Sequence, residues 1–185
     1  AEVNMTRERS TLDFEQTPQG FVPAATSVIT GNSQVGVHPE TGQLVSYEAS
    51  TMSPLPGFPN VANLEPTDPT INRDRTVSAF LNAQRDTMHV ANHANEAFEV
   101  ATGSDLIAPT LDVHGWVYTV TDKNTIVAAN TSRTGQVLEI MHPWAGRDVE
   151  ILSLRISPEG ARAAVVVQPD DGPAQLVVAG VIRDE

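Results

Sequence analysis

Short apolar runs separated by turn residues dominate the chain. From Phe21 onward the runs are four to eight residues long, and Val, Ile and Thr are their main residues. Gly, Pro, Asn and Asp bound the runs at intervals of roughly 8–12 residues, which is typical of an all-β domain. The expected strands are 42–47, 76–81, 116–120, 125–129, 136–140, 151–156, 161–167 and 175–182.

Residues 70–102 contain no Gly or Pro and allow two interpretations. A loose helical stripe runs through Val77, Phe80, Leu81, Met88, Ala91 and Phe98. Alternatively, the segment forms three strands, 77–81, 87–91 and 97–101, joined by polar turns. We favour the strands, because a repeat in the sequence begins in this segment.

Three segments, which begin at Ile71, Leu111 and Ile156, share one pattern. Each has an aliphatic residue, a four-residue turn that ends in Gly or Arg, and a β-rich run. The spacings are 111 − 71 = 40 and 156 − 111 = 45 residues. A period in the forties with about four short strands per unit is the signature of a β-propeller blade.

Weaker copies of the pattern occur at 37–47 and 130–138, so we expect about four units of 40–45 residues. The predicted fold is therefore all-β, with propeller blades that form part of a larger propeller. Residues 1–20 are expected to be a polar tail or a single strand, because polar and apolar residues alternate only at 11–15. Residues 21–185 are expected to be a partial β-propeller domain.

The alternation within the runs predicts which side chains form the core. The predicted core residues are Val77, Ala79, Val117, Thr119, Ile126, Leu154, Ile156, Ala163, Val165, Leu176 and Val178. The runs 163–167 and 176–181 are continuously apolar, which predicts burial on both faces.

Blades bury their faces only against neighbouring blades, so part of a propeller has two open ends. The chain stops directly after an apolar run, which suggests a fragment of a longer protein. We expect it either to close as a small ring of four units or to pair with another copy through its terminal strands.

The chain is acidic and lacks cysteine. Its 185 residues include 11 Lys and Arg against 23 Asp and Glu, a net charge of −12. No basic cluster is present to neutralise phosphates, which argues against a nucleic-acid or anionic-membrane partner. The absence of Cys excludes disulfides and thiolate-bound metals, and we expect no cofactor. No run approaches the roughly 20 apolar residues of a membrane span, and no signal peptide precedes the first run.

Three short motifs resemble a metal site, a nucleophile motif and a calcium site, and each has a simpler structural interpretation. His89 and His93, with Glu96, have a metal-ligand spacing on a helix, but on a strand the two imidazoles are roughly 13 Å apart. The segment 31–36 misses the G-x-S-x-G nucleophile motif by one residue, so we interpret it as a loop. The Asp170-Asp171-Gly172 segment could bind calcium, but Asp-Gly between two apolar runs predicts a hairpin turn.

The segment 141–146, Met-His-Pro-Trp-Ala-Gly, holds the residues that we single out. Trp144 either packs on the propeller or anchors a partner protein. In the second case, His142 and Arg147 are expected to contact the same partner. The acids Glu139, Asp148 and Glu150 lie close in sequence, and paired carboxylates beside an aromatic residue can serve a glycosidase. We predict no catalytic residues and no metal ligands.

The segments 106–120, 146–167 and 175–183 resemble a blade of the LpqB-type lipoproteins of actinobacteria, and the resemblance extends over about Gly36 to Arg183. It implies a β-propeller that follows a spore-germination-like domain and is held outside the membrane by a lipidated N-terminal Cys. It also implies a link to the extracytoplasmic domain of a sensor histidine kinase. This sequence has neither the lipidated Cys nor the preceding domain, so the anchor is implied for the parent protein only.

Two classes of function follow from these observations. In the first, the domain is a non-catalytic scaffold at the cell envelope that modulates an extracytoplasmic sensor kinase of a two-component system. In the second, it is part of a propeller hydrolase with acids at the central channel. Such an enzyme would gather acids or His where the inner strands end. The matching positions Thr76, Trp116 and Ala161 offer none, so we choose the scaffold and predict that the chain is not an enzyme.

Overall fold

The computed structural model describes residues 3–13, 27–28, 33–38, 40–48, 51–94, 96–132, 136–145 and 147–183. These residues form strands and one short 3-10 helix, η1 (Ala62–Leu64). None of the described helical residues forms a helix that is long and apolar enough to cross a membrane. The prediction of an all-β fold is confirmed.

The strands form four antiparallel sheets of four strands each within the described part of the chain. The first sheet contains β2 (Ser27–Val28), β3 (Ser33–Val37), β4 (Leu44–Glu48) and β5 (Thr51–Pro54). The second contains β6 (Thr67–Ile71), β7 (Val77–Leu81), β8 (Thr87–Asn92) and β9 (Glu96–Thr102). The third contains β10 (Thr110–Leu111), β11 (Trp116–Thr121), β12 (Thr125–Asn130) and β13 (Val137–Glu139). The last contains β14 (Val149–Ile156), β15 (Arg162–Pro169), β16 (Gln175–Arg183) and β1 (Val3–Asp13).

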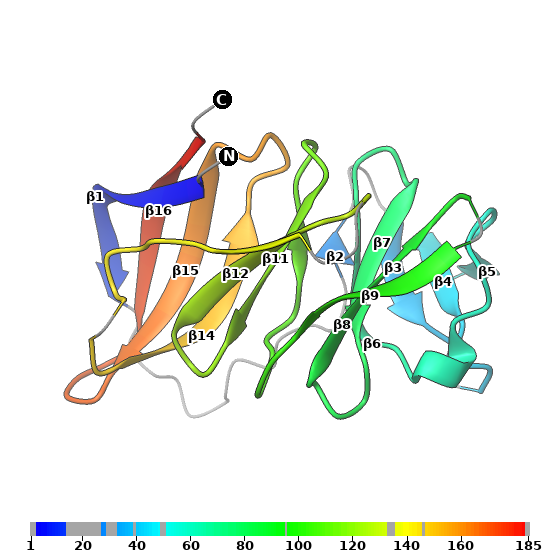
Figure 1. Cartoon of the computed structure of the whole chain (residues 1–185), viewed down its shortest axis with the longest axis horizontal. Coiled ribbons are helices and arrows are strands. Elements are labelled where there is room, and N and C mark those ends of the chain that lie inside the picture. The colour runs from blue at the N-terminus through cyan, green and yellow to red at the C-terminus, as the bar shows by residue number, and fades with distance from the viewer. Residues whose placement is uncertain are drawn as a thin grey trace.

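The four sheets stand in a row in chain order, and the first and the last lie at opposite ends (Figure 1). Neighbouring sheets touch through the first strand of the following sheet: β6 contacts β2 and β3, β10 contacts β6, and β14 contacts β10 and β11. Each sheet is therefore one propeller blade with its first strand innermost. The blades form an open arc, so the alternative of a closed four-unit ring is wrong for this structure.

The predicted repeat corresponds to the turn between the first and second strands of a blade. The residue that ends the turn has a positive φ in all three copies: 58° at Arg75, 80° at Gly115 and 72° at Gly160. Gly adopts this left-handed conformation without a steric penalty, which explains its use at two of the three positions. A polar side chain opens each turn, as when Asn72 Oδ1 accepts the backbone N–H of Thr76 at 2.8 Å.

Residues 70–102 form strands rather than a helix. The three expected strands are β7, β8 and β9, and their boundaries differ from the prediction by one residue at most. The intervening turn at 82–86 repeats the Asn-capped geometry, because Asn82 Oδ1 accepts the backbone N–H groups of Asp86 and Thr87, both at 3.1 Å. The capped turns break the chain between the strands, so the apolar residues of the loose helical stripe lie on three separate strands rather than on one helix.

The hydrophobic core lies between successive blades. One buried cluster joins the first and second sheets around Phe80 and Val35, a second joins the second and third sheets around Leu81 and Val117, and a third joins the third and last sheets around Tyr118. Burial of these faces against neighbours is the expected source of stability in a stacked-blade architecture.

Most of the predicted core is correct, with an error in β16. The buried predictions are Ala79, Val117, Thr119, Ile126, Leu154, Ile156, Ala163 and Val165. Val77, Leu176 and Val178 are only half-buried, and in β16 the alternate residues Val177 and Ala179 fill the core instead. A continuously apolar strand does not reveal which of its faces meets the neighbouring blade, so the expected register was wrong by one residue.

The strand β1 completes the last blade. It pairs antiparallel with β16, from Val3 opposite Arg183 to Asp13 opposite Gln175. It is longer than the stretch 11–15 expected from the sequence, and residues 14 and 15 lie outside the described residues. Because β1 occupies the edge of β16, that edge is not open for pairing with another copy in this structure, and self-association stays a prediction. The boundary at residue 20 also lies outside the described residues and stays a prediction.

Candidate functional site

The segment that connects β13 to β14 carries the three residues predicted to contact a partner. Trp144 is 6% exposed and packs into the core between the third and last blades. His142 is 9% exposed, and its ring lies 5.8 Å from the Trp144 ring at an angle of 34°. The structure therefore supports the packing alternative for Trp144. Contact of Trp144 and His142 with a partner stays a prediction, and both side chains are buried in this structure.

Hydrogen bonds within this connection and to the third blade hold it in place. The N–H of Ile140 donates to the carbonyl of Ile126 at 2.8 Å, and the N–H of Arg147 donates to the carbonyl of Trp144 at 3.1 Å. Asn124, in the turn between β11 and β12, donates from Nδ2 to the carbonyl of Arg147 at 3.1 Å. These bonds fix the position of the connection, so its exposed side chains form a defined surface.

His142 is electrostatically unusual. Its Nδ1 is buried, and no hydrogen-bond partner is described for it. Burial lowers the pKa of His142 below its ordinary value, while a backbone hydrogen bond with Asn124 and the charge of Glu139 oppose this shift. The folded chain therefore favours the neutral imidazole.

The exposed side chains of this connection include those of Met141 and Arg147. Met141 is 63% exposed, the largest fraction among the large exposed hydrophobic side chains of the described residues, and Arg147 is exposed as well. Arg147 remains a predicted partner contact. Exposed methionines are over-represented at adaptable binding surfaces, and nothing in the sequence distinguished Met141 from the other three methionines.

Met141 and Arg147 belong to one end of the molecule, where loops of successive blades are joined by hydrogen bonds. The N–H of Gly103 donates to the carbonyl of Asp86 at 2.9 Å, and the N–H of Asp122 donates to the carbonyl of Ser104 at 3.2 Å. Further along, the N–H of Asp170 donates to the carbonyl of Asp148 at 3.4 Å. The loops thus form a continuous border from the second blade to the last.

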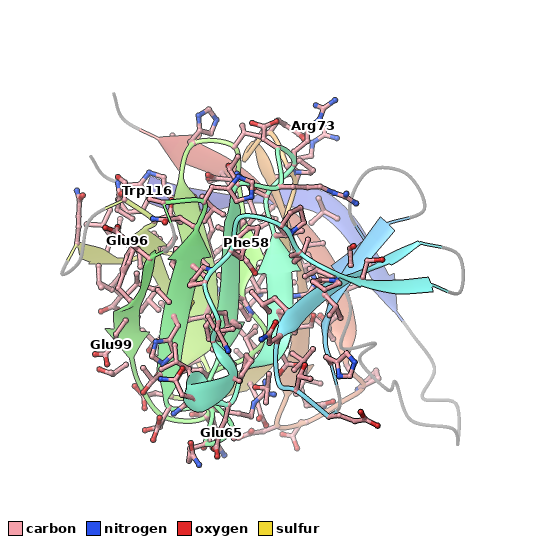
Figure 2. All side chains as sticks on the ribbon, turned by 90° about the vertical axis from the view of Figure 1, so that its right-hand side faces the viewer. Phe58, Glu65, Arg73, Glu96, Glu99 and Trp116 are labelled. Atoms are coloured by element: carbon pink, nitrogen blue, oxygen red, sulfur yellow. The ribbon has the colours of Figure 1, made fainter. Side chains whose placement is uncertain are left out.

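Exposed aspartates recur along this border, which we call the acidic rim. Its members are Asp86, Asp105, Asp122, Asp148 and Asp170. The members are distant in sequence, and only the stacking of blades places them along one edge. Glu65 lies at the same end of the molecule as the acidic rim. Figure 2 shows Arg73 far from Glu65, at the opposite end.

The inner strands carry one charged network. Arg85 forms a salt bridge with Asp68 on β6, and its Nε donates to the carbonyl of Leu106 at 3.1 Å. Arg155 on β14 donates to the carbonyl of Ala108 at 3.3 Å. Burial lowers the pKa of Arg155, and the charge of Asp68 opposes this effect. Arg85 thus joins the second blade to the linker before the third, and Arg155 joins the last blade to the same linker.

The remaining candidate residues lie apart from one another. His89 stacks on Phe80 with a centroid distance of 5.5 Å, while His93 meets the edge of Phe58 at 4.8 Å. In the described part of the chain, no group of three His, Asp or Glu could hold a metal ion. Asp170, Asp171 and Gly172 form the turn between β15 and β16, as the sequence predicts.

The structure gives no support to the other two candidate sites, the acids Glu139, Asp148 and Glu150 and the segment 31–36. Glu139, Asp148 and Glu150 are exposed, and no interaction that joins their carboxylates is described. In the segment 31–36, residues 31 and 32 lie outside the described residues, and Ser33 begins β3, so the interpretation as a loop is wrong from Ser33 onward.

Two comparisons with known proteins agree with this architecture. The family model of the lipoprotein LpqB β-propeller domain matches residues 42–185, well over half of the chain. Among solved structures, TolB from Acinetobacter baumannii is similar with a TM-score of 0.55 and 11% sequence identity. The similarity covers 80% of this chain and 39% of the TolB chain, so the chain spans less than half of that structure. At this identity the likeness shows a shared fold. No curated protein matches the sequence.

Proposed function

Because this chain belongs to the LpqB β-propeller domain family, we propose that it is a non-catalytic protein-interaction scaffold at the cell envelope. Its partner in this proposal is the extracytoplasmic domain of a sensor histidine kinase, whose two-component signalling it modulates. The parent protein is held at the membrane by a lipid anchor upstream of this domain. The family membership is the observation that carries the proposal.

The distribution of charged and exposed residues supports a scaffold. The acidic rim presents carboxylates from three blades along one edge, and Met141 and Arg147 lie beside it. In contrast, charged side chains near the inner strands are paired within the fold, as Arg85 is with Asp68 in the second blade. A surface of this kind favours association with a basic partner and accelerates encounter at low ionic strength.

The test is direct binding of the full-length parent protein to the sensor-kinase ectodomain, measured at low and high salt. We expect association that weakens as salt rises, because exposed charges are screened within about 8–10 Å at physiological ionic strength. A triple variant, Asp122→Asn, Asp148→Asn and Asp170→Asn, should slow association.

The matched control is Asp74→Asn, an exposed aspartate in the turn at the opposite end of the second blade. This variant should bind as the unmodified protein does. Absence of binding at every salt concentration would contradict the proposed partner, and binding that ignores both salt and the triple variant would contradict the role of the acidic rim.

A further inference from the structure

Two arginines from different blades meet the linker that leads into β10, the inner strand of the third blade. Arg85 Nε donates to the carbonyl of Leu106 at 3.1 Å, and Arg155 Nη1 donates to the carbonyl of Ala108 at 3.3 Å. Between these two residues, the N–H and the carbonyl of Ile107 are both bonded to β11. The carbonyls of Leu106 and Ala108 therefore face the opposite side of the linker, about 6–7 Å apart in an extended chain.

Arg155 reaches this linker around the inner edge of the last blade. Its neighbours Leu154 and Ile156 are buried in the core shared with the third blade, so the Arg155 side chain leaves β14 on the other face. β14 is the edge strand of its sheet in the described part of the chain. The bond to Ala108 requires the side chain to pass around that edge. The guanidinium thus lies where the inner strands of the blades converge.

One carboxylate is described close to the two guanidiniums. Asp68 lies in a bulge of β6, and a bulge re-aims the side chain that it contains. The Asp68 carboxylate is paired with Arg85. Burial lowers the pKa of Arg155, and the charge of Asp68 opposes this effect. Two positive charges thus meet one negative charge, and among the described residues Arg155 has no ion pair of its own.

Both guanidiniums still have donors to offer. The described bonds of Arg155 come from Nη1, which donates to the carbonyls of Ala108 and Leu154, while those of Arg85 come from Nε and Nη1. The edge of Arg155 that carries Nε and Nη2 therefore has no described partner. Two adjacent N–H donors of a guanidinium match the two oxygens of a carboxylate. Arg155 is exposed and the Arg85 side chain is 43% exposed, so a ligand can reach both.

The surrounding charges decide which anion fits. Asp86 directly follows Arg85, Asp105 directly precedes Leu106, and both aspartates are exposed. Together with Asp68 they disfavour a ligand with two or more negative charges, such as a phosphate dianion. A single carboxylate balances the excess positive charge instead. We propose that Arg85 and Arg155 form a binding site for one carboxylate group at the inner edge of the third blade.

The site does not depend on the number of blades in the parent protein. Its groups all belong to the second, third and last blades of this chain. The inner strands of a propeller surround a central channel, so additional blades would extend the ring around this edge and leave it facing the channel. The carboxylate comes either from a small free molecule or from an acidic side chain of a protein segment in the channel.

The test is titration of this 185-residue chain with acetate, followed by the NMR signals of the arginine Nε–H groups. Acetate should shift the signals of Arg85 and Arg155 in a saturable way, and phosphate in its dianionic form should bind more weakly. Arg155→Gln should weaken acetate binding about tenfold or more, because a charge-assisted pair of bonds is lost. Arg155→Lys keeps the charge but lacks the paired donors, so it should weaken binding as well.

The matched control is Arg73→Gln, which removes an exposed arginine at the opposite end of the second blade. It should bind acetate as the unmodified chain does, and circular dichroism should show the same β content in all variants. No saturable shift with acetate, tighter binding of phosphate, or equal binding by the Arg155 variants would overturn the proposal.

A second titration distinguishes the two sources of the carboxylate. The probe is the tripeptide Gly-Glu-Gly with blocked ends, and Gly-Gln-Gly is its uncharged counterpart. Tighter binding of the Glu peptide than of acetate supports a protein segment as the ligand, and weaker binding supports a small free carboxylate. Equal binding of the two peptides would contradict recognition of the carboxylate. None of these outcomes depends on kinase binding, so this proposal and the scaffold proposal can fail separately.

Discussion

The backbone N–H of Val113 donates to the carbonyl oxygen of Pro158 at 2.9 Å. These residues occupy the same position in the second and third copies of the repeat, 45 residues apart in sequence. Nearby, the ring Nε2 of His114 lies 3.1 Å from the carbonyl oxygen of Glu159, which is again its counterpart in the next copy. Equivalent turns of adjacent blades therefore contact each other directly. The residues of the repeat shape the turn within each blade and also join one blade to the next.

This relationship predicts the effect of proline at the Val113 position. The third copy already accommodates Pro158 there, so the backbone should accept the ring, and the main loss is the N–H that reaches Pro158. Val113→Pro should lower the free energy of unfolding by about 1 kcal/mol. The control is Arg73→Pro in the first copy, where no hydrogen bond from the N–H is described. Equal losses in urea unfolding for both variants would contradict the importance of this bond.

The glycine that ends the turn in the second and third copies should be intolerant of most side chains for conformational reasons. Gly115 has a φ of 80°, and its nearest side-chain neighbour would be 3.4 Å from an added Cβ, so space is not limiting. Gly115→Ala should therefore cost about 1–2 kcal/mol from left-handed strain alone. Gly115→Asn should cost less, because Asn tolerates this conformation. Equal thermal stability of the two variants would show that strain is not the cause.

A core substitution should destabilise the junction between the last two blades. Leu154 and Val165 are fully buried and face each other across β14 and β15. Val165→Ala or Leu154→Ala should cost on the order of 1–4 kcal/mol, through lost transfer free energy and the cavity left behind. Val137→Ala, at an exposed position on β13, should be nearly neutral. Chemical denaturation of the three variants measures the difference.

The buried pair of Asp112 and Tyr118 should show the cost of removing a donor. The Tyr118 hydroxyl donates to Asp112 Oδ2 at 2.9 Å, while Asp112 Oδ1 accepts the N–H groups of His114 and Trp116. Tyr118→Phe deprives a buried carboxylate of one donor and should lower stability by about 1–3 kcal/mol. A neutral effect in urea unfolding would mean that another group takes over the donation.

Stability should fall as the solution becomes acidic, in part because of His142. Burial lowers its pKa in the folded chain, so the unfolded chain binds a proton more readily. The contribution of His142 to stability is therefore present above its ordinary pKa of about 6.5 and is lost as the pH falls below that value. Burial also lowers the pKa of His89, which acts with the same sign.

The pH prediction is tested by urea unfolding of the unmodified chain and His142→Gln at pH values on both sides of that ordinary pKa. The variant should lose part of the pH dependence and retain the part due to His89. If the two chains show the same dependence on pH, His142 is protonated as easily in the folded state as in the unfolded one.

Local sequence determined the strands and the turns of this protein. The Gly and Asn residues of the turns act through their own backbone conformation and through hydrogen bonds to residues two to five positions away, as Asn72 does with Thr76 and Val77. Alternation of apolar residues likewise identified Ala163 and Val165 as core positions. Such short-range effects are visible in a single sequence, and together with the period of the repeat they indicated propeller blades.

The stacking of blades determined the contacts between segments that are distant in sequence. It buried Trp144, selected Val177 over Leu176 and Val178 for the core, and aligned the aspartates of the acidic rim. It also placed β1 beside β16, a pairing between the two ends of the chain that no local pattern encodes. Each of these outcomes depends on which surface meets which neighbour, and the free energy of that choice comes from contacts between residues far apart in sequence.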